Sequence, residues 1–140
     1  SAGRANLHQG AVAAGIDLCS GRTIHAARHD RPVRVHPNTG ESLLGRTIPH
    51  FDRVLEIAVA ATDRTELGYV GADIVVDARR GPVILELNAR PGLAVQLANQ
   101  AGLLPRLEAV DEHWRRGRSV PDRIGLGREI AANARNAACA

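Results

Sequence analysis

The chain contains no lysine and no methionine, and all 18 of its basic residues are arginine. The absence of lysine excludes every mechanism that needs an amine from this chain, such as a Schiff base, a P-loop lysine or a lysine general base. The absence of methionine, in a chain that begins Ser-Ala-Gly, predicts a segment or a processed product of a longer protein.

Aromatic residues are also scarce, at 2% of the 140 residues, namely Phe51, Tyr69 and Trp114. Because single-stranded nucleic acids are bound by stacking bases on aromatic side chains, this shortage argues against such a module. The net charge of +3 suits a phosphate-bearing ligand but falls short of a duplex-binding surface. We therefore expect no nucleic-acid partner.

Long apolar runs and paired cysteines are missing as well. No run approaches the roughly 18 apolar residues of a membrane-spanning helix, and no charged-then-apolar leader is present. The two cysteines, Cys19 and Cys139, lie far apart and form no CxxC motif, which indicates buried or free thiols of a reducing compartment; the alternative is a single disulfide. The sequence predicts a cytoplasmic protein without a membrane partner and leaves the oligomeric state open.

Hydrophobic residues make up 44% of the chain, enough for one core of Val, Ile, Leu and Ala. Apolar spacing and turn residues predict an α+β fold of antiparallel hairpins backed by helices. We expect residues 1–117 to form a partial domain and residues 118–140 a C-terminal tail, helical or frayed. The predicted strands are 10–18, 22–28, 69–77 and 82–88, and the predicted helices begin at Pro49, Leu93, Pro105 and Arg128.

The second predicted hairpin places polar groups together on one face. If its turn is centred between Arg79 and Arg80, Asp73 lies directly opposite Glu86, with their Cβ atoms roughly 5 Å apart. Asn88 lies beside Glu86 on the same face, because side chains alternate along a strand. This polar face is predicted to hold Asp73, Val75, Asp77, Ile84, Glu86 and Asn88. The opposite, apolar face is predicted to hold Ile74, Val76, Val83, Leu85 and Leu87.

Two carboxylates and an amide oxygen are the ligands of a hard cation such as Mg²⁺. Like charges placed opposite each other destabilise a hairpin unless something positive lies between them. The alternative is an amphipathic hairpin whose polar face is solvated. A register error of one residue would break the predicted geometry.

Two further groups are candidates for contacts with phosphates. Arg90 follows Asn88 by two residues, and near a metal-bound phosphate it could stabilise negative charge; the alternative is a surface arginine at a strand end. Near the amino end, Arg4, Asn6 and His8 form a short polar run ahead of a strand, which either reaches a nucleotide or is a frayed terminus.

Three segments in this order resemble the C-terminal half of an ATP-grasp ligase domain. They are RANLHQGA at 4–11, LGYVGADIVVD at 67–77 and GPVILELNARPGLAVQLANQAGL at 81–103. The chain is most similar to RimK-type glutamate ligases and the related α-L-glutamate ligase-like proteins, over residues 4 to about 107. The resemblance implies the C-terminal ATP-grasp subdomain, with antiparallel β-hairpins packed against helices.

The resemblance also implies roles for individual residues. Asp73, Glu86 and Asn88 match the ligands of Mg²⁺ or Mn²⁺, with Glu86 bridging two ions beside the nucleotide. Arg4 and Asn6 match residues that face the nucleotide phosphates and the acyl-phosphate site. Arg90 resembles a catalytic arginine of some ATP-grasp enzymes, although RimK-type ligases often have a small residue there.

The reaction implied by the resemblance is ATP-dependent ligation of a carboxylate to an amine through an acyl phosphate. The substrates would be an amino acid or a peptide, with glutamate favoured. In these enzymes, lysines and a glycine-rich loop from the earlier half contact ATP, so we expect the isolated chain to be inactive. The rival hypotheses are an incomplete fragment that binds metal, nucleotide or a partner, and a basic binding module that acts through its arginines.

Overall fold

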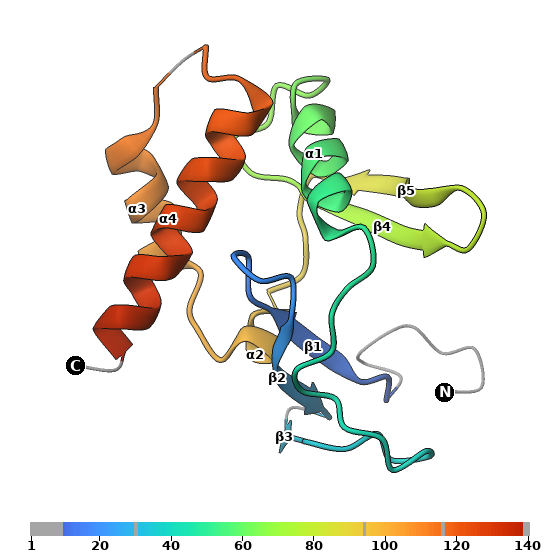
Figure 1. Ribbon diagram of the computed structural model, residues 1–140. Helices are drawn as coiled ribbons and strands as arrows, with labels where there is room; N and C mark the ends of the chain where they lie inside the picture. The colour runs from blue at the N-terminus through green and yellow to red at the C-terminus, as the bar shows by residue number, and fades with distance from the viewer. Residues whose placement is uncertain (1–9, 30, 94, 116, 139–140) are drawn as a thin grey trace. The chain divides into compact units, whose positions relative to one another are not determined.

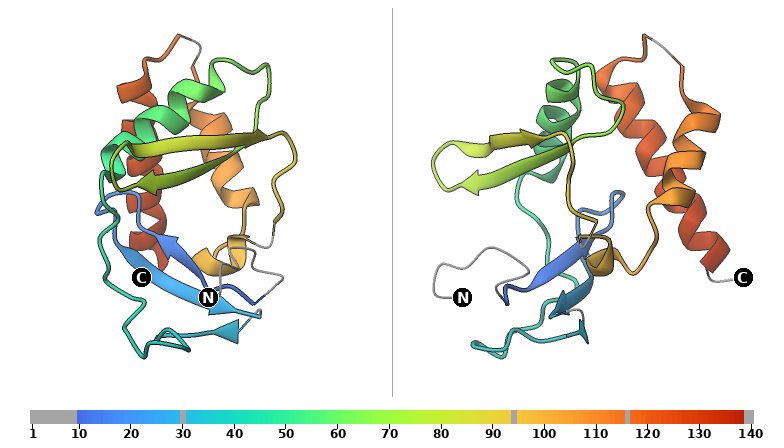
Figure 2. Two further views of the ribbon diagram at one scale, coloured as in Figure 1. Left: turned by 90° about the vertical axis from the view of Figure 1, so that its right-hand side faces the viewer. Right: turned by 180° about the vertical axis from the view of Figure 1, so that it is seen from behind.

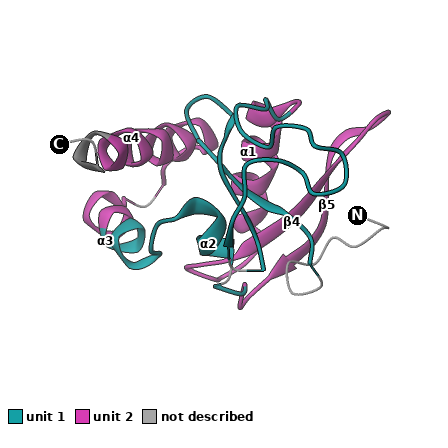
Figure 3. Cartoon of the chain, turned by 90° about the horizontal axis from the view of Figure 1, so that it is seen from below, with its two compact units in different colours: residues 1–48, 92–108 teal, residues 49–91, 109–140 magenta. Residues whose placement is uncertain are grey.

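The computed structural model describes residues 10–29, 31–93, 95–115 and 117–138. Its helices and antiparallel sheets confirm the predicted α+β class. The chain divides into two compact units, one of Ser1–Ile48 with Gly92–Glu108 and the other of Pro49–Pro91 with Ala109–Ala140 (Figure 3). Within the described ranges, no helix has both the length and the apolar character needed to cross a membrane.

The first unit is built on a three-stranded antiparallel sheet, in the order β1-β2-β3. The strands are β1 (Ala13–Ile16), β2 (Thr23–Arg28) and β3 (Arg31–Pro32), and the short helix α2 (Val95–Asn99) packs against β1 and β2 (Figure 1). The side chains of Ala26, Ala27 and Ala98 are buried. Small side chains therefore allow the helix to lie close to the sheet.

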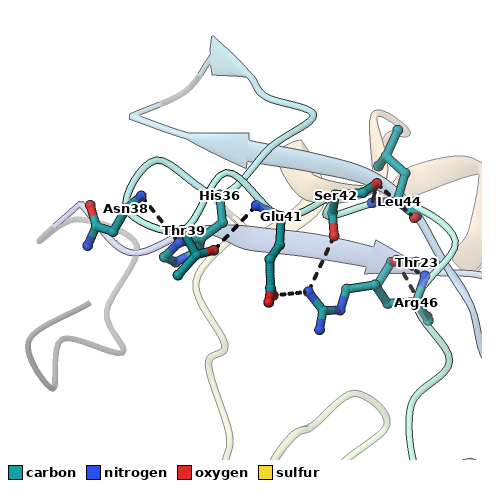
Figure 4. Close-up of polar contacts among 8 residues, drawn as sticks. All are labelled: Thr23, His36, Asn38, Thr39, Glu41, Ser42, Leu44 and Arg46. Atoms are coloured by element: carbon teal, nitrogen blue, oxygen red, sulfur yellow. Dashed lines mark hydrogen bonds and ion pairs between the residues drawn. The ribbon is translucent and has the colours of Figure 1, made fainter.

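The segment after β3 is tied to β2 by polar contacts (Figure 4). Arg46 donates from its backbone N–H to Thr23 Oγ1 at 3.0 Å, and its guanidinium pairs with Glu41 at 2.7 Å. The hydrogen bond and the charge of Arg46 lower the pKa of Glu41. The loop thus has an ordered hydrogen-bonded path along the sheet.

The second unit contains α1 (Phe51–Thr62), the hairpin of β4 (Gly71–Asp77) and β5 (Gly81–Asn88), and α4 (Val120–Ala138). The helix α3 (Leu104–His113) continues from the first unit into the second. One side of α1 packs on β4 and β5, and α1 also packs along α4 (Figures 1 and 2). The helix therefore covers one face of the hairpin.

The last helix begins earlier than the helical stretch predicted from Arg128. Ser119 caps it, since its Oγ accepts the backbone N–H of Asp122 at 3.3 Å and donates to the Asp122 carboxylate at 2.6 Å. Arg123 pairs with Asp63, and Arg128 pairs with Asp52, so two ion pairs join α4 to α1 and the residue after it. These contacts attach the C-terminal helix to the second unit.

Candidate metal site

The hairpin of β4 and β5 places the two predicted carboxylates opposite each other. Asp73 pairs with Glu86 in the antiparallel register, and Gly71 pairs with Asn88 two positions further along. Asp73, Glu86 and Asn88 therefore share one face of the hairpin, because pairs two residues apart point to the same side. All three side chains are exposed.

The turn of this hairpin differs from the predicted one. Asp77 pairs with Gly81, so the turn is centred on Arg79 instead of lying between Arg79 and Arg80. Gly81 has a φ of +73°, which favours glycine at this position. The register then shifts between Asp73 and Ile74, and Leu85 is left without a partner in a β-bulge.

The bulge changes which residues share the apolar face. Ile74 lies opposite Ile84, and Val75 lies opposite Val83. The prediction that Val83 belongs to the apolar face and Ile84 to the polar face is therefore wrong. Leu85, also predicted on the apolar face, is 64% exposed. The corrected face includes the half-buried Ala72, Ile74, Pro82 and Ile84, and because α1 packs on both strands of the hairpin, we assign this face to α1.

The bulge has a physical reason. If the register set by the turn continued without it, Leu85 would pair with Asp73, and Glu86 would pair with Ala72 on the face covered by α1. Burial of an unpaired carboxylate against a helix costs several kcal/mol, of the order of ~2–7 kcal/mol even for neutral polar groups. The bulge avoids this cost, because it returns Glu86 and Asn88 to the exposed face.

The site carries negative charge that no arginine of the described segments neutralises. The ion pairs of the described segments involve neither Asp73 nor Glu86. Across the same segments, no group of three or more His, Cys, Asp and Glu side chains could hold a metal ion. A cation at this hairpin would therefore rely on two carboxylates, the amide of Asn88, and ligands from water or a substrate.

The oxygen donors fit a hard divalent cation. Mg²⁺ is usually held by one or two carboxylates, with waters and substrate phosphates completing its coordination. Asn88 Oδ1 accepts the backbone N–H of Arg90 at 2.9 Å. An amide oxygen has two lone pairs, so Asn88 keeps one for a cation.

The remaining predicted site residues are placed only in part. Arg90 is exposed and follows directly after β5, in the same unit as the carboxylates. Arg4 and Asn6 lie outside the described residues. Sequence reasoning missed two residues near the site, Leu85 at the bulge and Gly71 opposite Asn88. The sequence offered one signal for Gly71: a glycine inside a predicted strand often marks the close approach of another segment.

The hairpin turn is held by the carboxylate of Asp77. The backbone N–H groups of Arg80 and Arg79 donate to Asp77 Oδ1 at 2.8 and 2.9 Å. These two hydrogen bonds, that from Arg80 above all, lower the pKa of Asp77. The turn is thus stabilised most when the carboxylate is ionised.

We predict that this turn loosens in acid. Because the folded pKa lies below the unfolded value of about 4, the stabilisation is fully present above that value and is lost as the pH falls through the folded pKa. Amide chemical shifts of Arg79 and Arg80, followed from pH 7 to pH 2, should report one common transition. Asp77→Asn keeps an oxygen acceptor and should abolish the transition; a transition that persists in this variant would contradict the assignment.

A family model places the chain in the ATP-grasp class. Within that class, the chain belongs to the family described as sugar-transfer associated ATP-grasp, whose model matches residues 1–112. Neither a curated protein nor a solved structure matches the chain significantly. The match supports the ATP-grasp part of the resemblance and leaves its RimK-type part as a proposal.

Proposed function

We propose that the chain forms the metal-binding part of an ATP- and Mg²⁺-dependent ligase that joins a carboxylate to an amine. The observation that carries this proposal is the register of the hairpin, which pairs Asp73 with Glu86 on an exposed face. Membership of an ATP-grasp family supports the use of ATP. Because the reaction consumes ATP, we place the protein in the cytoplasm.

Three side chains would hold the cation, namely Asp73, Glu86 and Asn88. Bound Mg²⁺, or Mn²⁺, would supply positive charge against the phosphates of ATP. In this proposal the carboxylates of Asp73 and Glu86 hold the cation, and Asn88 contributes a neutral oxygen beside them. Ion binding also removes the repulsion between the two opposed carboxylates.

Arginine and asparagine side chains would contact the phosphates directly. We assign Arg90 to stabilisation of the charge that develops during phosphoryl transfer, because it follows β5 at the site. We assign Arg4 and Asn6 to the nucleotide and acyl-phosphate side, on the basis of the sequence motif alone. None of these roles requires an amine, which agrees with a chain that has no lysine.

The proposed reaction has two steps. A substrate carboxylate oxygen attacks the γ-phosphorus of ATP, and ADP leaves, so that an acyl phosphate forms. The amine nitrogen then attacks the acyl carbon, phosphate leaves, and the nitrogen loses a proton to give an amide. Catalysis rests on alignment and charge stabilisation, and no covalent enzyme intermediate is needed.

We propose an amino acid or a peptide as the substrate class, with glutamate as the first candidate. The motif ELNARPGLA, which resembles RimK-type and α-L-glutamate ligase-like proteins, supports glutamate. The description of the family as sugar-transfer associated adds amino sugars and sugar-linked amines to the acceptors that merit testing.

A second candidate function is a catalytically incomplete chain that binds metal, nucleotide or a partner without turnover. The exposure of large apolar side chains in the described part of the chain favours this incomplete-chain hypothesis. Leu93 is 64% exposed and Leu104 is 65% exposed, and no large side chain of that part is fully buried. The sequence also lacks any lysine that could contact ATP.

The proposed function is tested by product formation in the longest protein that contains these residues. We expect release of ADP and phosphate that depends on Mg²⁺, a carboxylate and an amine together, with an amide product detected by mass spectrometry. Phosphate release without an amide product would contradict the ligase proposal. Calorimetry of that same protein with Mg²⁺–ATP addresses the second candidate, which predicts binding there without formation of product.

A further inference from the structure

A close contact between Gly71 and Pro91 lies directly beside Asn88. Gly71 is paired with Asn88 in the hairpin. A Cβ atom on Gly71 would lie 2.8 Å from Pro91 Cβ, 3.4 Å from Pro91 Cγ and 3.8 Å from Asn88 Cβ. The first distance is shorter than two carbon atoms tolerate, so no side chain fits at position 71 while Pro91 keeps its place.

The need for glycine at position 71 concerns space and not backbone freedom. Gly71 does not have a positive φ, and it is the first residue of β4. Any residue could adopt its conformation, so the approach of Pro91 is what excludes a side chain. Glycines inside strands often mark such an approach by another segment of backbone.

Pro91 also ends the turn that orients Asn88. Within this turn, the backbone N–H of Arg90 donates to Asn88 Oδ1 at 2.9 Å. Since Pro91 follows Arg90 directly and has a restricted φ, a displacement of its ring moves the Arg90 peptide with it. The position of the proline against Gly71 therefore determines where the hydrogen bond directs the amide of Asn88.

From this geometry we infer that Gly71 is a positioning residue for the amide oxygen of Asn88, because it leaves room for residue 91 and so for the turn that holds Arg90. The inference rests on the proposed function, in which this oxygen is a ligand of the cation. Groups that orient a metal ligand typically change metal affinity by about 10- to 100-fold when they are altered. Gly71 does not need to touch the cation for this effect.

The test uses substitutions that either fill or reopen the space between residues 71 and 91. Gly71→Ala fills this space with a Cβ atom. Gly71→Ala combined with Pro91→Gly reopens it, because both clashing Cβ atoms are then no longer present together. Gly71→Ala combined with Pro91→Ala is the matched control, since it removes the proline ring but keeps the Cβ atom that clashes.

Two readouts are measured for each variant of the full protein: Mn²⁺ affinity by electron paramagnetic resonance, and hydrogen exchange of the Arg90 amide without metal. Gly71→Ala should weaken Mn²⁺ binding about tenfold or more and speed the exchange of Arg90. The Pro91→Gly double variant should recover most of both properties, and the Pro91→Ala double variant should recover neither.

The outcomes separate this inference from the proposed function. If the wild type binds no Mn²⁺, the metal site fails, and the exchange of the Arg90 amide still decides whether Gly71 positions Asn88. Unchanged exchange and affinity in Gly71→Ala, or equal recovery in both double variants, would overturn the inference. If Gly71→Ala does not fold, the Pro91→Gly double variant should fold; its failure to do so would also overturn the inference.

Discussion

Glu86→Gln is expected to abolish ligation while the hairpin stays folded. Glu86 lies on the exposed face, so the isosteric replacement removes no buried contact. It removes one negative charge and one strong ligand oxygen from the pair with Asp73. Loss of such a charge contact in an active site lowers the rate by roughly 100-fold or more. The rates at which ADP and the amide product form, measured in the longest protein that contains these residues at saturating Mg²⁺–ATP, check this expectation.

The matched control is Glu66→Gln, at an exposed glutamate of the same unit outside the hairpin. It makes the same chemical change and should leave turnover unchanged. Without Mg²⁺, Glu86→Gln should also raise the melting temperature slightly, because it relieves repulsion between opposed carboxylates. Full activity of Glu86→Gln would remove the basis for the metal assignment.

Ile84→Asn is expected to destabilise the second unit by about 2 kcal/mol, whereas Leu85→Asn should change stability by less than ~0.5 kcal/mol. Ile84 is half-buried opposite Ile74 on the face that α1 covers. Asparagine there would lose apolar contact and place an amide against a helix. Leu85 is 64% exposed at the bulge, so a polar side chain costs little.

Urea unfolding of the two variants, with the wild type as reference, measures this difference. The register predicted from the sequence, with its turn between Arg79 and Arg80 and no bulge, places Leu85 on the apolar face and Ile84 on the polar face, so it predicts the opposite order. A larger loss of stability for Leu85→Asn than for Ile84→Asn would show that Leu85 belongs to the core and that the register predicted from the sequence holds instead.

The opposition of Asp73 and Glu86 could be predicted from the sequence although the assumed turn was wrong. The real turn is centred on Arg79, which by itself would pair Asp73 with Leu85. The bulge at Leu85 then moves Glu86 back by one position. The two differences offset each other, so the predicted pair is correct while the residues between it and the turn were assigned to the wrong faces.

The contact between Gly71 and Pro91 could not be predicted from the sequence. Strand alternation relates residues within a hairpin, but it does not show where the segment after β5 folds back. The glycine and the proline lie 20 positions apart in the chain, and only the folded turn brings their atoms together. Local spacing therefore predicted which acidic and amide groups share a face but not the contact that lies beside Asn88.

Taken alone, the sequence determined the properties that depend on local pattern. The lack of lysine excluded amine chemistry, and alternation along two strands predicted a hairpin with acidic and amide groups on one side. The tertiary structure decided the register in detail, because the cover of one face by α1 makes a carboxylate on that face unfavourable. The packing of α1 on the hairpin and the burial of Ile74 and Ile84 favour a bulge at Leu85, which leaves Glu86 exposed beside Asp73.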